Sequence, residues 1–120
     1  LAEEISRRTL ETGGRQRVLL QVNVAGEAQK QGIPPEEVRE AVRTLLQLPG
    51  ISLEGLMAIP PFMENPEEVR PYFRRMTKLA QEIGDPLREI SMGMSHDFEV
   101  AIEEGATLVR IGTAIFGERE

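Results

Sequence analysis

Two turns near the end of the chain carry the residue types that can bind an anion. One short apolar run ends at Met94 and Ser95, and a second ends at Gly112 and Thr113. Small residues at such turns leave backbone N–H groups free, and glycine lets a ligand approach the main chain closely. Because the turns are close together in the sequence, we predict that they hold one phosphate group from two sides.

Arg110 lies inside the second apolar run, two residues before Gly112. Side chains alternate along a strand, so Arg110 and Gly112 are expected on the same face. An arginine that faces a protein interior needs an anion or an acceptor nearby, because burying an unpaired charge is costly. The pattern therefore predicts that Arg110 faces a ligand.

Several residues near these turns also have simpler interpretations. Ser95 is a preferred N-cap residue even without a ligand, and Gly112 could serve only the geometry of its turn. We interpret His96 as a solvated residue in the first turn of a helix, and not as a catalytic base. Tyr72 belongs to the apolar stripe of its helix and is expected in the core.

The composition restricts the classes of protein that fit. The 120 residues are enough for one domain, and a net charge of -6 argues against a nucleic-acid partner. Because the chain has no cysteine and only one histidine, it lacks the means for disulfides, thiolate catalysis or a histidine metal cluster. No apolar run approaches the roughly 20 residues of a membrane helix. We expect a cytoplasmic protein without membrane contact.

Helices and strands are predicted to alternate four times along the chain. The expected helices are residues 1–12, a segment starting at 34–37 and stopped by Pro49 and Gly50, residues 66–83, and a segment starting near Ser95. The expected strands are residues 17–24, 51–59, 88–92 and 107–111. The third helix has a clear start, with Asn65 as its N-cap and Pro66 at its first position.

This alternation predicts an α/β fold with a parallel sheet. A doubly wound sheet usually carries its phosphate loop after the first strand, whereas a (β/α)₈ TIM barrel carries it after strands 7 and 8. The phosphate turns here follow the last two strands, which favours the barrel. Since a barrel takes about 250 residues, we interpret the chain as one partial domain that supplies strands 5 to 8.

The two turns also resemble the signature of a known family. The residues at 91–95 and 109–117 are similar to those of the pyridoxal phosphate homeostasis (YggS-like) proteins, and the similarity extends to residues 21–27 and 55–60. The resemblance implies a barrel like the N-terminal domain of alanine racemase. It also implies binding of pyridoxal 5′-phosphate (PLP) without robust catalysis, in a role that balances vitamin B6 and amino-acid pools.

The resemblance assigns a role to each candidate residue. Met94 and Ser95 would bind the PLP phosphate through backbone N–H groups and the Ser95 hydroxyl, while Gly112 and Thr113 would bind it from the other side. Arg110 would donate to the pyridine nitrogen. A guanidinium can only donate, so this nitrogen would stay unprotonated and the ring would be a poorer electron sink. Such a site holds the cofactor more than it uses it.

The lysine that forms the Schiff base with PLP ends the first strand in this family, which places it upstream of this chain. Neither Lys30 nor Lys78 matches that position. We therefore expect a C-terminal half-barrel whose partner is the missing N-terminal half or a second copy of the chain. Apo-enzymes that depend on PLP are further candidate partners.

Two other functions fit the same turns. One is a PLP-dependent enzyme such as an amino-acid racemase, with His96 or Tyr72 as the candidate base. Racemases of this fold carry an additional β-domain and a catalytic tyrosine from a partner subunit, and neither is evident in the sequence. The other is a barrel that binds a different phosphorylated metabolite.

Overall fold

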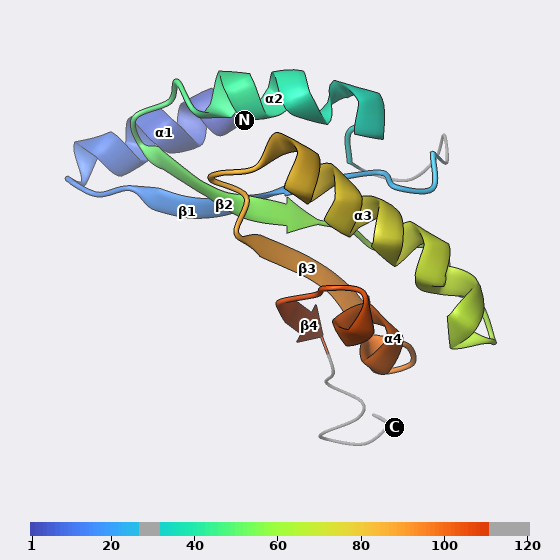
Figure 1. The fold of residues 1–120 in the computed structure, drawn as a ribbon. Coiled ribbons are helices and arrows are strands. Elements are labelled where there is room, and N and C mark those ends of the chain that lie inside the picture. The colour runs from blue at the N-terminus through green and yellow to red at the C-terminus, as the bar shows by residue number, and fades with distance from the viewer. Residues whose placement is uncertain (27–31, 111–120) are drawn as a thin grey trace.

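The structure is a computed structural model that describes residues 1–26 and 32–110 (Figure 1). Its strands form one sheet of four: β1 (Gln16–Gln21), β2 (Ile51–Met57), β3 (Glu89–Met94) and β4 (Leu108–Arg110). They lie side by side in sequence order, and each pairs in parallel with the next. The predicted parallel α/β sheet is confirmed.

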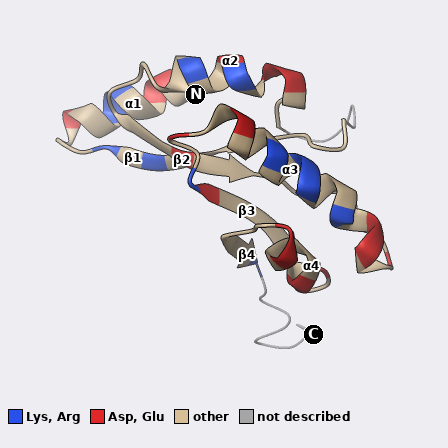
Figure 2. Cartoon of the chain, in the orientation of Figure 1, with Lys and Arg blue, Asp and Glu red and all other residues tan. Residues whose placement is uncertain are grey.

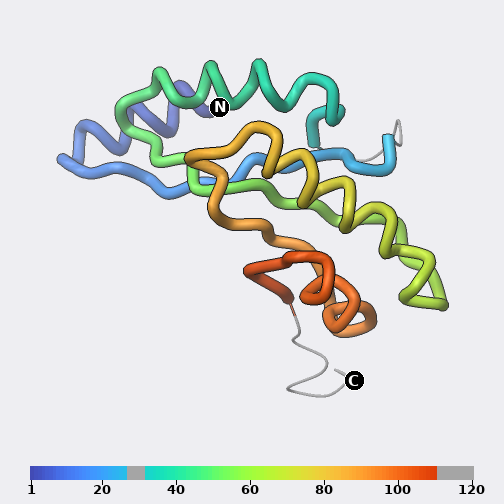
Figure 3. The backbone as a smooth tube through the Cα atoms, viewed as in Figure 1, coloured from blue at the N-terminus to red at the C-terminus, as the bar shows by residue number. Residues whose placement is uncertain are grey.

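The described helices all lie on one face of this sheet, as the ribbon and the backbone tube show (Figures 1 and 3). They are α1 (Ala2–Glu11), α2 (Val38–Leu45), α3 (Arg70–Ile83) and α4 (Phe98–Glu103), with 3₁₀ turns η1 (Pro35–Glu37) and η2 (Pro66–Val69) before α2 and α3. A doubly wound sheet has helices on both faces, whereas a barrel has them only outside. The arrangement is that of a half-barrel.

The start of the third predicted helix is confirmed in its cap and corrected in its first turn. Asn65 accepts a hydrogen bond from the Glu67 N–H at 3.0 Å, as an N-cap residue does. The residues that follow form the 3₁₀ turn η2, so α3 begins only at Arg70. It ends at Gly84, whose φ of 78° suits glycine.

The end of β3 and the start of α4 differ from the sequence prediction. The strand continues to Met94, two residues beyond the expected end, because Met94 pairs with Arg110 of β4. A turn then intervenes, and the helix begins at Phe98 and not near Ser95. The extra strand residues place Met94 and Arg110 on neighbouring strands.

The first two strands are shorter than predicted at their carboxyl ends. β1 stops at Gln21, and Val22 forms only an isolated bridge to Ile33. β2 stops at Met57, where Ala58 still donates its N–H to the Ser91 carbonyl at 3.0 Å. Val22, Val24 and Ala58 are buried by packing, which the sequence pattern cannot distinguish from pairing in the sheet, whereas Ile59 is exposed.

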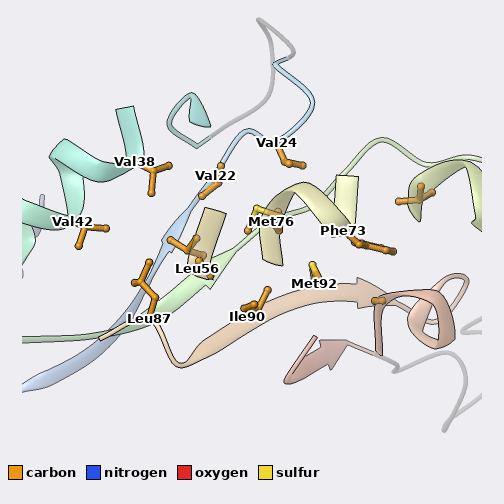
Figure 4. Close-up of a cluster of buried hydrophobic side chains, with 14 of the residues drawn as sticks. Val22, Val24, Val38, Val42, Leu56, Phe73, Met76, Leu87, Ile90 and Met92 are labelled. Atoms are coloured by element: carbon orange, nitrogen blue, oxygen red, sulfur yellow. The ribbon is translucent and has the colours of Figure 1, made fainter. Parts of the chain in front are cut away.

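The core lies between the sheet and its helices (Figure 4). Its buried side chains are Val22, Val24, Val38, Val42, Leu53, Leu56, Ala58, Val69, Phe73, Met76, Ala80, Leu87, Ile90, Met92, Val100 and Ala101. Phe73 and Met76 of α3 are fully buried near Met92 of β3. Tyr72 is half-buried and packs against this cluster, at its margin and not in its centre.

The opposite face of the sheet carries no helix among the described residues. An open hollow of about 450 Å³ lies there and is lined from all four strands, by Arg17, Val18, Leu19, Glu54, Glu89 and Leu108. Leu108 remains 45% exposed although it is a large apolar side chain. In a closed barrel this face is interior, so the half-barrel leaves an interior surface open.

One prediction concerns the close approach of β2 and β3. A Cβ atom on Gly55 would lie 1.8 Å from the Glu89 carbonyl oxygen, whereas a Cβ on Gly14 would meet nothing within 4 Å. We expect Gly55→Ala to lower the free energy of unfolding by about 1–3 kcal/mol, because the strands must separate. Gly14→Ala is the control and should stay within about 0.5 kcal/mol. Equal urea midpoints for the two variants would contradict this packing.

Candidate functional site

The candidate site lies at the carboxyl-terminal edge of the sheet. Met94 ends β3, Ser95 follows it directly, and Arg110 of β4 is the paired neighbour of Met94. Adjacent strands lie about 4.8 Å apart, so one small ligand can contact residues at both strand ends. The structure thus brings together three of the five predicted site residues. The other two, Gly112 and Thr113, lie outside the described residues.

Arg110 has hydrogen-bonding capacity that the described residues do not use. Its Nη2 donates to the Ala58 carbonyl, beyond the end of β2, in a long hydrogen bond of 3.5 Å. Its Nε is buried and has no hydrogen-bond partner in the part of the chain that the structure describes. A buried donor without a partner costs about 1–3 kcal/mol. This donor is therefore available to an acceptor outside the described residues.

The turn at residues 94–97, which we call the phosphate turn, is closed by two hydrogen bonds. The Met94 N–H donates to Oδ1 of Asp97 at 2.8 Å, and the Asp97 N–H donates to the Met94 carbonyl at 3.1 Å. Asp97 precedes α4 in the N-cap position, so the interpretation of Ser95 as the N-cap is wrong. A ligand phosphate that accepts from the Met94 N–H has to displace the Asp97 carboxylate.

His96 joins the phosphate turn to the loop after β2. Its Nε2 lies 2.9 Å from the Met63 carbonyl oxygen and 2.8 Å from that of Glu64. Its ring also contacts the Phe62 ring, with centroids 4.8 Å apart. His96 is exposed, as its interpretation as a solvated residue predicted, but it precedes α4 and does not belong to the first turn of that helix. Sequence reasoning missed these contacts because they join residues more than thirty positions apart.

One flank of the phosphate turn is acidic. A hollow of about 260 Å³ lies beside Ser95 and His96, and three carboxylates contribute to its lining: Glu67, Asp97 and Glu99. Carboxylates close to a phosphate raise its energy by like-charge repulsion. The acidic lining therefore makes this hollow unfavourable for a phosphate group.

The helix after the phosphate turn is held to α3 by an ion-pair cluster, where the basic face of α3 meets acidic residues (Figure 2). The Arg70 guanidinium donates to the carboxylates of Glu67, Glu103 and Glu104 at 2.8, 2.7 and 2.6 Å. Thr77 also donates its hydroxyl to the Glu104 carbonyl. These contacts fix the end of α4 on α3 and so restrain the turn that precedes α4.

The same cluster shifts the acidity of its members. Hydrogen bonds from Arg70 hold the pKa of Glu67 and that of Glu104 below their usual range. The hydrogen bonds that Glu67, Glu103 and Glu104 accept from Arg70 raise the pKa of its guanidinium above the usual value. Both carboxylates therefore stay ionised, and the cluster stays intact, in mildly acidic solution.

Residues 1–26 and 32–110 contain neither a candidate metal site nor a candidate membrane-spanning helix. No group of three or more histidine, aspartate or glutamate side chains there is placed to hold a metal ion. No helix in the same segments has the length and apolar character needed to cross a bilayer.

Comparison with known proteins decides the family. The sequence profile of the alanine racemase N-terminal domain matches residues 1–120. The chain belongs to this family. Within it, the chain is 53% identical to the pyridoxal phosphate homeostasis protein of Aquifex aeolicus, over all of this chain and 54% of that protein. The corresponding protein of Pseudomonas aeruginosa is 48% identical over 86% of the chain. The resemblance found in the sequence is confirmed.

The chain spans about half the length of the curated relatives it matches. Among solved structures, PipY of Synechococcus elongatus with PLP bound superposes with a TM-score of 0.81 at 34% identity, over 97% of this chain and 56% of PipY. An alanine racemase of Clostridium difficile has a TM-score of 0.77 at 18% identity, over 98% of this chain and 34% of the racemase. The second similarity shows the alanine racemase-type barrel fold alone.

A second prediction concerns the Arg70 cluster and pH. The folded-state pKa values of Glu67 and Glu104 lie below the unfolded values. Their contribution to stability is therefore complete above the unfolded pKa and is lost as the pH falls through the folded pKa. We expect Arg70→Met to destabilise the fold at pH 7 and to have a much smaller effect at pH 3, measured by urea unfolding.

Arg43→Met is the matched control for this experiment. The ion pair of Arg43 with Glu40 at 3.3 Å is exposed on both sides, with side chains 67% and 75% accessible. Exposed pairs contribute little, so this variant should follow the wild type at both pH values. An effect of Arg70→Met that is equal at pH 7 and pH 3 would rule out the proposed role of the ion pairs.

Proposed function

We propose that this chain forms the non-covalent part of a PLP site in a cytoplasmic protein that balances PLP and amino-acid pools without robust catalysis. The observation that carries the proposal is the buried Nε of Arg110, which has no partner among the described residues and lies beside the phosphate turn. Relatives support it. The Aquifex protein is named for pyridoxal phosphate homeostasis, and the PipY structure contains PLP.

In this proposal the two ends of the cofactor bind to different strands. Ser95 and the Met94 N–H bind the phosphate beyond β3, together with Gly112 and Thr113. Arg110 of β4 donates to the pyridine nitrogen. Bound PLP supplies an electron sink, and an arginine at this nitrogen makes that sink weaker because a guanidinium cannot protonate the ring. The residues are therefore suited to holding the cofactor.

A lysine for covalent attachment is proposed to lie outside this chain. Lys78 is on α3 and borders a hollow with Pro35 and Glu82, and the lining of that hollow includes none of the strand-end residues that carry the site. Lys30 lies outside the described residues. The share of the site that we assign to this chain is recognition of the phosphate and of the ring nitrogen.

The structure constrains both candidates for a catalytic base. The Nε2 of His96 donates to two carbonyl oxygens, so only its Nδ1 is left to accept a proton. Tyr72 packs against the core cluster on α3, which is not typical of a base that is ready to remove a substrate proton.

The proposal includes completion of the barrel by other polypeptide. The helix-free face, with its hollow of about 450 Å³, would be covered by the other half-barrel present in longer relatives or by a second copy of this chain. In the described sheet β1 and β4 are the edge strands, and the outer edges of such strands can pair with further polypeptide. Apo-enzymes that depend on PLP are the proposed recipients of the cofactor.

A third prediction tests the role of Arg110. We expect the 120-residue chain to bind PLP, and Arg110→Met to raise the dissociation constant by about 10- to 100-fold, because a hydrogen bond from a charged donor is lost. Equilibrium dialysis measures the binding, and circular dichroism checks the fold of both proteins. Arg39→Met on the exposed face of α2 is the control and should bind like the wild type.

Two further measurements separate the alternatives. Borohydride treatment in the presence of PLP should leave the mass of the chain unchanged, because the proposed attachment lysine is elsewhere. Ribose 5-phosphate should compete poorly, since it cannot accept from Arg110 as a pyridine nitrogen does. Equal competition by ribose 5-phosphate would favour the phosphorylated-metabolite alternative. A folded wild type that takes up no PLP would refute the proposal.

A further inference from the structure

The loop between β2 and η2 contacts both halves of the proposed site. At its start, the Ala58 carbonyl accepts from Nη2 of Arg110 at 3.5 Å. Near its end, the carbonyls of Met63 and Glu64 both lie within 2.9 Å of Nε2 of His96. The loop is thus a direct connection between the residue proposed for the ring nitrogen and the turn proposed for the phosphate.

The hydrogen-bond partners of His96 indicate which nitrogen of its ring carries the proton. Carbonyl oxygens only accept hydrogen bonds, so the proton must be on Nε2, which donates to Met63 and Glu64 together. The Phe62 ring packs beside the imidazole at 38°. Phe62 is 75% exposed, so burial in the core does not explain its position. At this end the loop is held by the histidine together with Met63, whose side chain packs against the core cluster.

The internal shape of the phosphate turn does not depend on this contact. Asp97 closes the turn through its own backbone and side chain, with bonds of 3.1 and 2.8 Å to Met94. His96 adds a direct restraint between the loop and the turn, which β3 and α4 already hold at its two ends. Because the loop also contacts Arg110, the histidine restrains the relative position of the phosphate turn and the guanidinium.

We infer that His96 is a positioning residue that makes the site selective for a ligand reaching from the phosphate turn to Arg110. The inference rests on the proposed function and adds a specificity determinant to it. A ligand that spans both groups depends on their relative position, and PLP is such a ligand. Inorganic phosphate contacts the turn alone and does not depend on it.

The two ligands give a test that separates positioning from general stability. We expect His96→Leu, which removes the N–H donor shared by both carbonyls, to raise the dissociation constant for PLP by about tenfold. Binding of inorganic phosphate, followed by ³¹P NMR line broadening, should change by less than about twofold. His96→Gln restores an N–H donor and should recover most of the PLP affinity. Phe62→Leu keeps both hydrogen bonds and is the matched control.

Several results would overturn the inference. Equal weakening of PLP and phosphate binding in His96→Leu would mean that the histidine only supports the fold. Unchanged binding of both ligands would mean that it does not position the turn. Failure of His96→Gln to recover PLP affinity when Phe62→Leu binds normally would exclude the donor as the cause.

The His96 contact can also be tested if the proposed function is wrong. If the folded wild type binds neither PLP nor phosphate, the function proposed above is wrong. Backbone ¹³C carbonyl chemical shifts then still test the contact itself, because His96→Leu removes the donor to the Met63 and Glu64 carbonyls and should shift their resonances while leaving those of β2 unchanged. Unchanged carbonyl shifts at these two residues would overturn the positioning role independently of any ligand.

Discussion

The parallel pairing of the strands in sequence order is the constraint on which the rest of the structure depends. It places the carboxyl ends of all four strands at one edge of the sheet and every described helix on one face. Residues from three separate segments therefore become neighbours: Ala58 after β2, Met94 at the end of β3 and Arg110 at the end of β4. The candidate site is a product of this topology more than of any single loop.

The short helix α4 shows how the sheet edge is stabilised. It has only six residues, and a helix of that length is marginal by itself because nucleation is costly. Its position comes from long-range contacts: the Arg70 cluster at its end and the burial of Val100 and Ala101 on β3. The phosphate turn is thus fixed between a strand and a helix that is anchored elsewhere.

Much of the architecture could be predicted from local pattern. The order of helices and strands, the Asn65 cap and the Gly84 stop follow from hydrophobic periodicity and from the preferences of single residues. The end of β3 could not be predicted, because pairing of Met94 with Arg110 extends the strand. The start of α4 could not be predicted either, because the Asp97 side chain closes a turn with the Met94 N–H before the helix begins at Phe98. The role of His96 was missed for a similar reason, since its partners are distant in sequence.

The hydrogen bond from the Met94 amide to Asp97 has a consequence for ligand exchange. The protein supplies its own carboxylate at that amide, so a phosphate arriving there replaces one anion by another. In the proposed function, release of the phosphate would return the carboxylate, so the amide would keep an anionic acceptor at both stages. Exchange at this position would then be an anion substitution with a small net change in hydrogen bonding.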